Sequence, residues 1–298
     1  MNRLDTAMAS ISDIADDAGI AVHVHARLVG PGVGFGEREV ALDADTQAPM
    51  ASLYKLQLAA CWSDLVRKGD LDATERLVLS AQGRAPGATG VACLGDDVAL
   101  SARDAVRLML ATSDNAAADT LLHRVGLERL DAWLQAQGLG RTRIHLGSAD
   151  MLRRVIAETG GRDLTEALAL LADPHHDRGT SQYDTALASV STARDLTTVL
   201  AQVWREPHHA WVRESMSHQH WDQRIRSGFP HDDVGVAAKS GTLGRLRHEI
   251  GVVTFPGEIP VGVAVLTRAV RPEIHQPRVE AAIGAIARAA VNALRTPV

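Results

Sequence analysis

The stretch Ser52-Leu53-Tyr54-Lys55 opens the strongest helical pattern in this chain of 298 residues. Apolar residues at helical spacing continue the pattern as far as Gly69, a residue typical of helix ends: Leu53, Leu56, Leu58, Ala59, Ala60, Trp62, Leu65 and Val66. A serine and a lysine three positions apart on a helix lie one turn apart on the same face. Ser52 is therefore expected at a helix start, where free backbone N–H groups favour negative charge. A desolvated Lys55 would lose its proton more easily and activate the Ser52 hydroxyl.

Two further motifs follow this stretch in a fixed order. Ser113-Asp114-Asn115 lies in the middle of the chain, and Lys239-Ser240-Gly241-Thr242 lies near its end. S-x-x-K alone is a weak signal, because a helix-start serine followed by a surface lysine gives the same pattern. The three motifs in this order match the signature of class A β-lactamases and penicillin-binding proteins. From about residue 3 to about residue 295, the chain resembles the class A β-lactamase-like serine hydrolases.

This resemblance implies acyl transfer through a covalent serine ester. Ser52 is then the nucleophile, and Lys55 takes or relays its proton. Ser113 resembles the relay serine that passes a proton to the leaving nitrogen. Asn115 resembles the residue that holds an amide of the substrate, while Asp114 is expected to brace the turn.

The third motif is expected to bind a small-molecule substrate that carries a carboxylate. Lys239, Ser240 and Thr242 suit a carboxylate through charge-assisted hydrogen bonds. The resemblance implies an oxyanion hole made by the backbone N–H groups of Ser52 and Thr242. Arg224 resembles an arginine that some family members add to the carboxylate site, and a surface arginine in a loop is an equal alternative. No cofactor and no metal are expected.

The chain departs from the family pattern at the residue that activates water. Class A β-lactamases carry a glutamate in an E-x-x-L-N pattern, and this pattern occurs nowhere in the sequence. Glu158 and Glu166 are the nearest glutamates, both in predicted helices where a solvated face is expected. Loss of a general base typically slows a reaction by about 10²–10⁴-fold, so slow deacylation is expected. The substitute bases considered are Asp150, His175, His176 and Tyr183.

Three functions remain open at this point. The first is hydrolysis of a β-lactam or a related cyclic amide through Ser52, which the three ordered motifs favour. The second is an esterase, amidase or D-amino-acid peptidase on the same scaffold, which the missing glutamate and the missing export signal favour. The third is a binder or sensor that is acylated once and stays acylated.

Composition excludes several classes of protein. A formal net charge of −5 gives no basic surface for nucleic acid, and no run of 18 apolar residues predicts a membrane span. The start of the sequence lacks the pattern of a signal peptide, so a cytoplasmic protein is expected, or a periplasmic or secreted one if this end is trimmed. Cys61 and Cys93 are expected to be free thiols. We expect a monomer or a weak homodimer.

Periodicity places strands at both ends of the chain and helices between them. A period of 3.6 predicts helices over 4–18, 52–68, 101–112, 116–123, 127–137, 148–158, 163–172, 193–205, 208–219 and 278–294. A period of 2 predicts strands over 20–29, 38–42, 234–240, 247–255 and 260–268.

These elements predict an α/β (α+β) β-lactamase-like fold. An antiparallel five-stranded sheet flanked by the terminal helices forms a discontinuous domain over 1–44 and 230–298. An all-helical second domain is expected over 45–229. His23 and His25 share one face of the first strand, where a solvated position is expected rather than half a metal site.

Overall fold

The computed structural model describes residues 3–33, 38–175 and 179–295. Its main sheet is antiparallel and five-stranded, in the order β2-β1-β9-β8-β7. These strands are β1 (Ile20–Leu28), β2 (Glu39–Leu42), β7 (Gly235–Leu243), β8 (Leu246–Thr254) and β9 (Val261–Ala269). Two short sheets pair β3 (Ala48–Pro49) with β6 (Val190–Ser191), and β4 (Arg76–Leu79) with β5 (Val98–Ser101).

Helices cover both sides of the sheet and fill the rest of the molecule. The α-helices of the described residues are α1 (Arg3–Ala18), α2 (Tyr54–Lys68), α3 (Ala102–Ala111), α4 (Asn115–Val125), α5 (Leu127–Ala136), α6 (Ser148–Thr159), α7 (Leu164–Leu171), α8 (Ala193–Arg205), α9 (Ala210–Ser217) and α10 (Pro277–Leu294). Short 3₁₀ turns are η1 (Ala51–Leu53), η2 (Gly90–Cys93), η3 (Ser181–Tyr183), η4 (Pro207–His209) and η5 (Ile225–Gly228).

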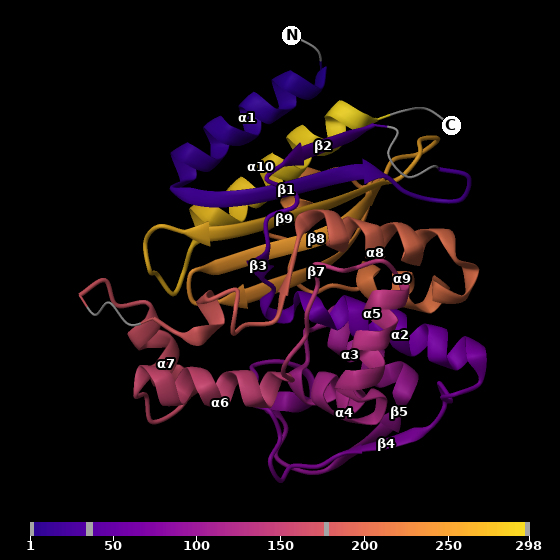
Figure 1. The fold of residues 1–298 in the computed structure, drawn as a ribbon, viewed down its shortest axis with the longest axis vertical. Coiled ribbons are helices and arrows are strands. Elements are labelled where there is room, and N and C mark those ends of the chain that lie inside the picture. The colour runs from indigo at the N-terminus through magenta and orange to yellow at the C-terminus, as the bar shows by residue number, and fades with distance from the viewer. Residues whose placement is uncertain (1–2, 34–37, 176–178, 296–298) are drawn as a thin grey trace.

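The two ends of the chain share the sheet, as the periodicity predicts. Strand β1 pairs with β9 from Ile20↔Ala269 to Leu28↔Val261. Helices α1 and α10 pack on one face of the sheet, and in Figure 1 α1 lies above the sheet while α10 runs behind its upper strands. Strand β9 is buried along nearly its whole length, because α8 covers the opposite face.

Helix α2 lies in the centre of the second core. Its residues Tyr54 to Ser63 are all buried, which is typical of a helix surrounded by other helices. Leu53, Leu56 and Trp62 are fully buried in this core. Helix α2 also begins next to the sheet, so its first residues lie between the helical part and the main sheet (Figure 1).

The structure corrects three expectations about local structure. Segment 45–229 is mostly helical but also contains the pairs β3–β6 and β4–β5, whose two to four residues are too short for a periodic signal. The helix expected over 208–219 is divided into η4 and α9. The histidine face of β1 is covered, since His25 is 0% exposed and its Nδ1 lies 2.5 Å from Thr197 Oγ1 of α8.

Other expectations about the fold agree with the structure. Helix α2 ends at Gly69, which has a left-handed φ of 82°, as expected of a helix-ending glycine. Cys61 and Cys93 are both free thiols. Among the described helices, none combines the length and the apolar character that a membrane span requires. The boundaries of the two domains stay a prediction.

Candidate active site

Ser52 lies in the η1 turn, directly before α2. The residue before it, Ala51, has a positive φ of 47°, a backbone conformation that costs energy for any residue except glycine. The turn is fixed on the β3 side, where Met50 N donates to Ser189 O at 2.9 Å. The Ser52 side chain is half-buried, and no described residue hydrogen bonds its hydroxyl. The hydroxyl is therefore free to approach a substrate at the start of a helix.

Buried His248 of β8 also fixes this turn. Its Nδ1 accepts a hydrogen bond from Thr267 N at 3.0 Å, so Nε2 carries the proton and donates to Pro49 O at 2.9 Å. Burial lowers the pKa of His248 to about 3, which keeps the imidazole neutral. His248 thereby connects the sheet to the residues just before Ser52.

Lys55 is fully buried one turn along from Ser52. Its Nζ donates to Ser113 O at 2.6 Å, to Asn115 Oδ1 at 2.7 Å and to Ser113 Oγ at 3.3 Å. The first and second motifs therefore meet directly, although 61 residues separate Ser52 from Ser113 (113 − 52).

Lys239 of β7 reaches the same hydroxyl from the sheet. Its Nζ donates to Ser113 Oγ at 2.9 Å and to Ser240 O at 2.6 Å. Ser113 has a positive φ of 56°, a strained backbone conformation for a residue other than glycine, and its hydroxyl lies between the two amines. All three motifs thus converge on one hydroxyl group.

Both lysines lose basicity because they are buried. Burial lowers the pKa of Lys55 to about 7, although the carboxylates of Asp114 and Asp119 raise it. Burial also lowers the pKa of Lys239 well below its ordinary value, and the charge of Lys55 lowers it further. Near neutral pH, Lys55 can therefore exist as a neutral amine that accepts a proton.

Asp114 and Asn115 hold the second motif in place. Asp114 is fully buried and caps α4 by accepting from Ala116 N and Ala117 N, and it also accepts from Val91 N. Asp114 therefore braces the turn. Asn115 donates from Nδ2 to Pro86 O at 2.8 Å, so both ends of its amide contact protein groups.

Strand β7 runs close to the η1 turn that contains Ser52, and the absence of a side chain at Gly241 permits this approach. A Cβ at Gly241 would lie 2.8 Å from Met50 O, closer than real Cβ contacts allow, and 3.1 Å from Leu53 Cγ. Because β7 is an edge strand, half of its backbone groups point away from β8. Thr242 follows on this edge with an exposed side chain. The arrangement leaves backbone N–H groups of the edge near Ser52.

Arg224 is a buried residue and not a surface arginine in a loop. Only 3% of it is exposed, and its guanidinium donates to Thr242 Oγ1 at 2.8 Å. The same group donates to Gly241 O and His248 O, and it pairs with Glu280 of α10 at 3.1 Å. Arg224 therefore adds positive charge directly behind the third motif.

The segment between the second and third motifs contains α6 and α7. An isolated antiparallel β-bridge between Arg143 and Val190 joins the two ends of the stretch that contains these helices. Glu158 accepts from Thr180 Oγ1 and Ser181 N, while Glu166 pairs with Arg162. Neither glutamate contacts Lys55 or Ser52.

Two of the four substitute bases considered from the sequence, Asp150 and Tyr183, are engaged elsewhere. Asp150 forms an ion pair with Arg153. Tyr183 accepts from Arg245 N at 3.0 Å, and burial raises the pKa of its hydroxyl. His175 is exposed, and His176 lies outside the described residues.

Two residues near Lys55 were missed by the sequence analysis. Asp119 lies on α4, four positions after Asn115, and its charge acts on Lys55. Its carboxylate accepts from Ser148 N at 2.5 Å and from Ala149 N at 2.7 Å at the start of α6. Tyr54 contacts the same place, with its OH 2.8 Å from Ser148 Oγ. The i, i+4 spacing from Asn115 is the signal that could have indicated Asp119.

A separate cavity of about 650 Å³ lies between the α1–β1 turn and the β9–α10 loop. Asp17, Arg271 and His275 are among the residues that line it, and the three motifs contribute none. The candidate site is therefore identified by the place where the side chains of the three motifs meet. The volume of a cavity does not identify it.

Comparison with known proteins agrees with this geometry. The family described as "Beta-lactamase enzyme family" matches residues 6–294. The chain belongs to this beta-lactamase enzyme family. A curated relative is the "Beta-lactamase regulatory protein BlaB" of Streptomyces cacaoi, 29% identical over 280 residues, which covers 86% of this chain and 89% of that protein.

Solved beta-lactamase structures share the fold over nearly the whole chain. The β-lactamase of Chitinophaga pinensis has a TM-score of 0.78 at 17% identity. The matched region covers 97% of this chain and 99% of that β-lactamase. That of Sphaerobacter thermophilus has a TM-score of 0.73 at 22% identity and covers 96% of each chain. A mutant of PBP-A, solved as an acyl-enzyme complex with penicillin-G, has a TM-score of 0.75 at 18% identity. The matched region covers 97% of this chain and 96% of the PBP-A chain. The predicted β-lactamase-like fold is confirmed.

Proposed function

We propose that this protein forms a covalent acyl-enzyme on Ser52 with a β-lactam or a related amide that carries a carboxylate. The observation that supports this most directly is the position of Ser113 Oγ, which accepts from Lys55 Nζ and Lys239 Nζ beside the Ser52 turn. Membership of the beta-lactamase enzyme family supports the same chemistry.

The proposed reaction begins at the Ser52 hydroxyl. Neutral Lys55 takes the hydroxyl proton as Ser52 Oγ forms a bond to the carbonyl carbon. The oxyanion is stabilised by the backbone N–H groups of Ser52 and Thr242. The carbon–nitrogen bond then breaks, and the nitrogen receives a proton through Ser113. The product is an ester of Ser52 with the opened substrate.

The substrate carboxylate is proposed to bind at the third motif. Thr242 has an exposed side chain there, and Arg224 donates to its hydroxyl at 2.8 Å. Because Arg224 also pairs with Glu280, its effect is to orient Thr242 and to add positive charge behind it. Ser240 and Lys239 complete this side of the proposed pocket.

A second candidate function is an acyl-enzyme that turns over slowly and acts as a sensor. Within the described part of segment 144–189, the glutamates and Asp150 are held by partners away from Ser52. The relative from Streptomyces cacaoi is described as a regulatory protein, which favours such a role. An esterase, an amidase or a D-amino-acid peptidase on this scaffold stays a further alternative. Cytoplasmic location and a monomer or weak homodimer stay predictions.

Intact-mass measurement over time tests acylation and turnover together. The full chain is mixed with a penicillin and, separately, with a chromogenic cephalosporin. We expect an added mass equal to the β-lactam, located on the peptide that contains Ser52. Ser52→Ala should remove the adduct, while Ser217→Ala, an exposed serine on α9, should keep it. Full β-lactam hydrolysis by Ser52→Ala would exclude every covalent scheme proposed above.

The lifetime of the adduct separates the candidate functions. Rapid loss of the added mass together with cephalosporin colour change supports a β-lactamase. A lasting adduct supports the slow-turnover sensor. No adduct with either compound, combined with hydrolysis of a simple aryl ester, contradicts β-lactam acylation and supports the esterase.

A further inference from the structure

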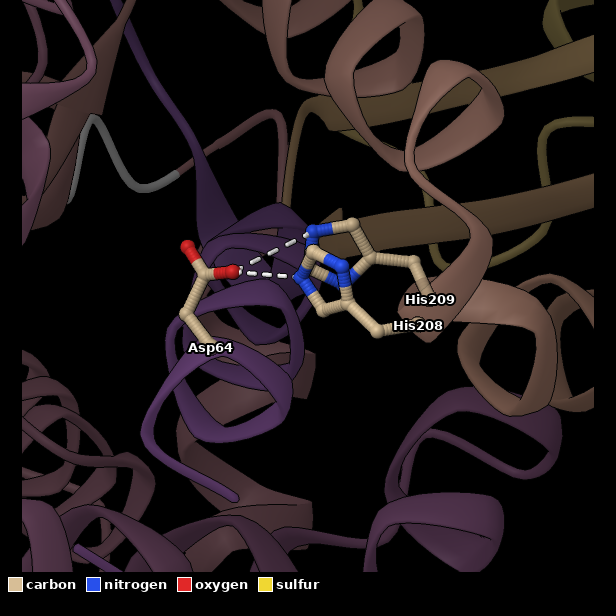
Figure 2. Close-up of side chains that lie close together, drawn as sticks. All are labelled: Asp64, His208 and His209. Carbon is tan, nitrogen blue, oxygen red and sulfur yellow. Dashed lines mark hydrogen bonds and ion pairs between the residues drawn. The ribbon is translucent and has the colours of Figure 1, made fainter. Parts of the chain in front are cut away.

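A second group of reactive side chains lies at the far end of the helix that begins beside Ser52. Asp64 of α2 faces His208 and His209 of η4, and Figure 2 shows the carboxylate directed at both rings. Asp64 is 12 residues after Ser52 (64 − 52), about 18 Å along a helix axis. The group therefore does not belong to the proposed acylation site.

The ligand atoms of these three side chains lie within 4.8 Å of one another, close enough to surround one metal ion. His208 Nε2 lies 2.6 Å from Asp64 Oδ1, and His209 Nε2 lies 3.7 Å from the same oxygen. Ligands of a tetrahedral zinc ion at about 2.0–2.1 Å are about 3.3 Å apart, a value between these two distances. Small side-chain rotations would place all three atoms around one ion.

His209 is the residue that hydrogen bonds leave unexplained. Its side chain is only 3% exposed, and its Nδ1 is buried without a hydrogen-bond partner among the described residues, while Nε2 lies 3.7 Å from Asp64 Oδ1. Nε2, the ring nitrogen that faces Asp64, is therefore the atom of His209 available to a metal ion.

The surroundings support the carboxylate as a ligand. Trp133 Nε1 of α5 donates to Asp64 Oδ2 at 2.8 Å, which leaves Oδ1 toward the histidines. Outer hydrogen bonds of this kind orient the ligands of metal sites. Arg67 opposes metal binding, because its Nε lies 4.0 Å from Asp64 Oδ1, but 53% of its side chain is exposed and can move away.

We propose that Asp64, His208 and His209 bind one divalent transition-metal ion of the zinc type. Two imidazoles and one carboxylate are ligands that Zn²⁺ accepts, with water in the fourth position. The ion would connect α2, the helix that begins beside Ser52, to the segment between α8 and α9. Its expected effect is to stabilise the fold and to leave acylation of Ser52 unchanged.

Calorimetric titration of the untagged, metal-stripped full chain with Zn²⁺ tests this site. We expect one equivalent of Zn²⁺ per chain and a rise in Tm of about 5 °C at saturating zinc. His209→Gln and Asp64→Asn should each weaken binding by at least about tenfold. The double variant His218→Ala/His220→Ala removes two exposed histidines and should bind as the wild type does.

A second measurement applies even where a variant fails to fold. Co²⁺ added to the wild-type chain should give intense visible absorption typical of four-coordinate geometry, and Zn²⁺ should abolish it. Arg67→Ala should tighten binding, because it removes a positive charge near Asp64. Absence of stoichiometric Zn²⁺ binding by the wild type, or loss of binding in the His218/His220 control, would overturn the proposal.

Discussion

Lys55 and Lys239 show what single residues contribute to the site. Every acceptor that the structure gives their amines is neutral: Ser113 O, Ser113 Oγ, Asn115 Oδ1 and Ser240 O. A buried lysine without a paired carboxylate is destabilised in its charged form. The sequence places these lysines in the motifs of the candidate site, and burial gives Lys55 a proton affinity suited to neutral pH.

The lowered pKa of Lys55 predicts how acylation depends on pH. Below about pH 7 the amine is protonated and cannot accept the Ser52 proton, so the rate constant of acylation should rise with pH through about 7. Stopped-flow measurement with a chromogenic cephalosporin gives this profile. Lys55→Ala should lose nearly all acylation, and Lys68→Ala, an exposed lysine on the same helix, should keep the wild-type profile. A profile without a change between pH 6 and 8 would argue against Lys55 as the base.

Among the secondary-structure elements, α6 has an unusual start. Its N-cap residue is Gly147, which has no side chain to accept from the first N–H groups. Asp119 of α4 accepts from two of them instead, and a Cβ at Gly147 would lie 2.6 Å from Asp119 Oδ1. The glycine permits a close approach that replaces the usual cap. Helix α6 is thereby connected to the helix that begins with Asn115.

Loss of this connection should destabilise the protein. Asp119→Ala leaves two N–H groups at the start of α6 without an acceptor, which should cost about 1–2 kcal/mol of unfolding free energy. Urea denaturation measures this difference. Asp150→Ala removes an exposed acidic residue in the first turn of the same helix and should change stability by about 0.5 kcal/mol or less. Similar losses in both variants would mean that the cap is not specific to Asp119.

At the scale of the whole molecule, Glu249 connects the main sheet to the segment between α9 and β7. This fully buried residue of β8 accepts from Ile225 N of η5 at 2.5 Å and from Gln219 Nε2 at 2.8 Å. Burial raises its pKa to about 6, although the charge of Arg224 lowers it. The protonated form is therefore favoured in the folded state relative to the unfolded state.

This raised pKa predicts a pH-dependent loss of stability. The contribution of Glu249 is fully present below its ordinary pKa of 4.5 and is lost as pH rises through about 6. Glu249→Gln cannot titrate, so its stability relative to the wild type should increase by about 2 kcal/mol between pH 4 and pH 7. Chemical denaturation at several pH values gives this difference. A constant difference would show that Glu249 has an ordinary pKa in the folded protein.

Much of the fold and the core of the candidate site could be predicted from local patterns. A change in period from 3.6 to 2 distinguishes the helices from the strands of the sheet, because each period reports which face of an element is buried. The three motifs indicate Ser52, Lys55, Ser113 and Lys239 by residue type and order. These signals depend only on residues close together in the sequence.

Burial of particular side chains was decided by elements far away in the sequence. Arg224 could not be distinguished from a surface arginine until η5 was seen to pack against β7 and α10, and His25 was expected in solvent until α8 covered its strand face. The Asp64–His208 pair joins residues 144 apart, which no local pattern relates. The sequence by itself determined the candidate site residues, through their motifs, and the period of the longer elements. Tertiary structure alone decided their environments, because burial, pKa and ligand geometry depend on side chains that only folding brings together.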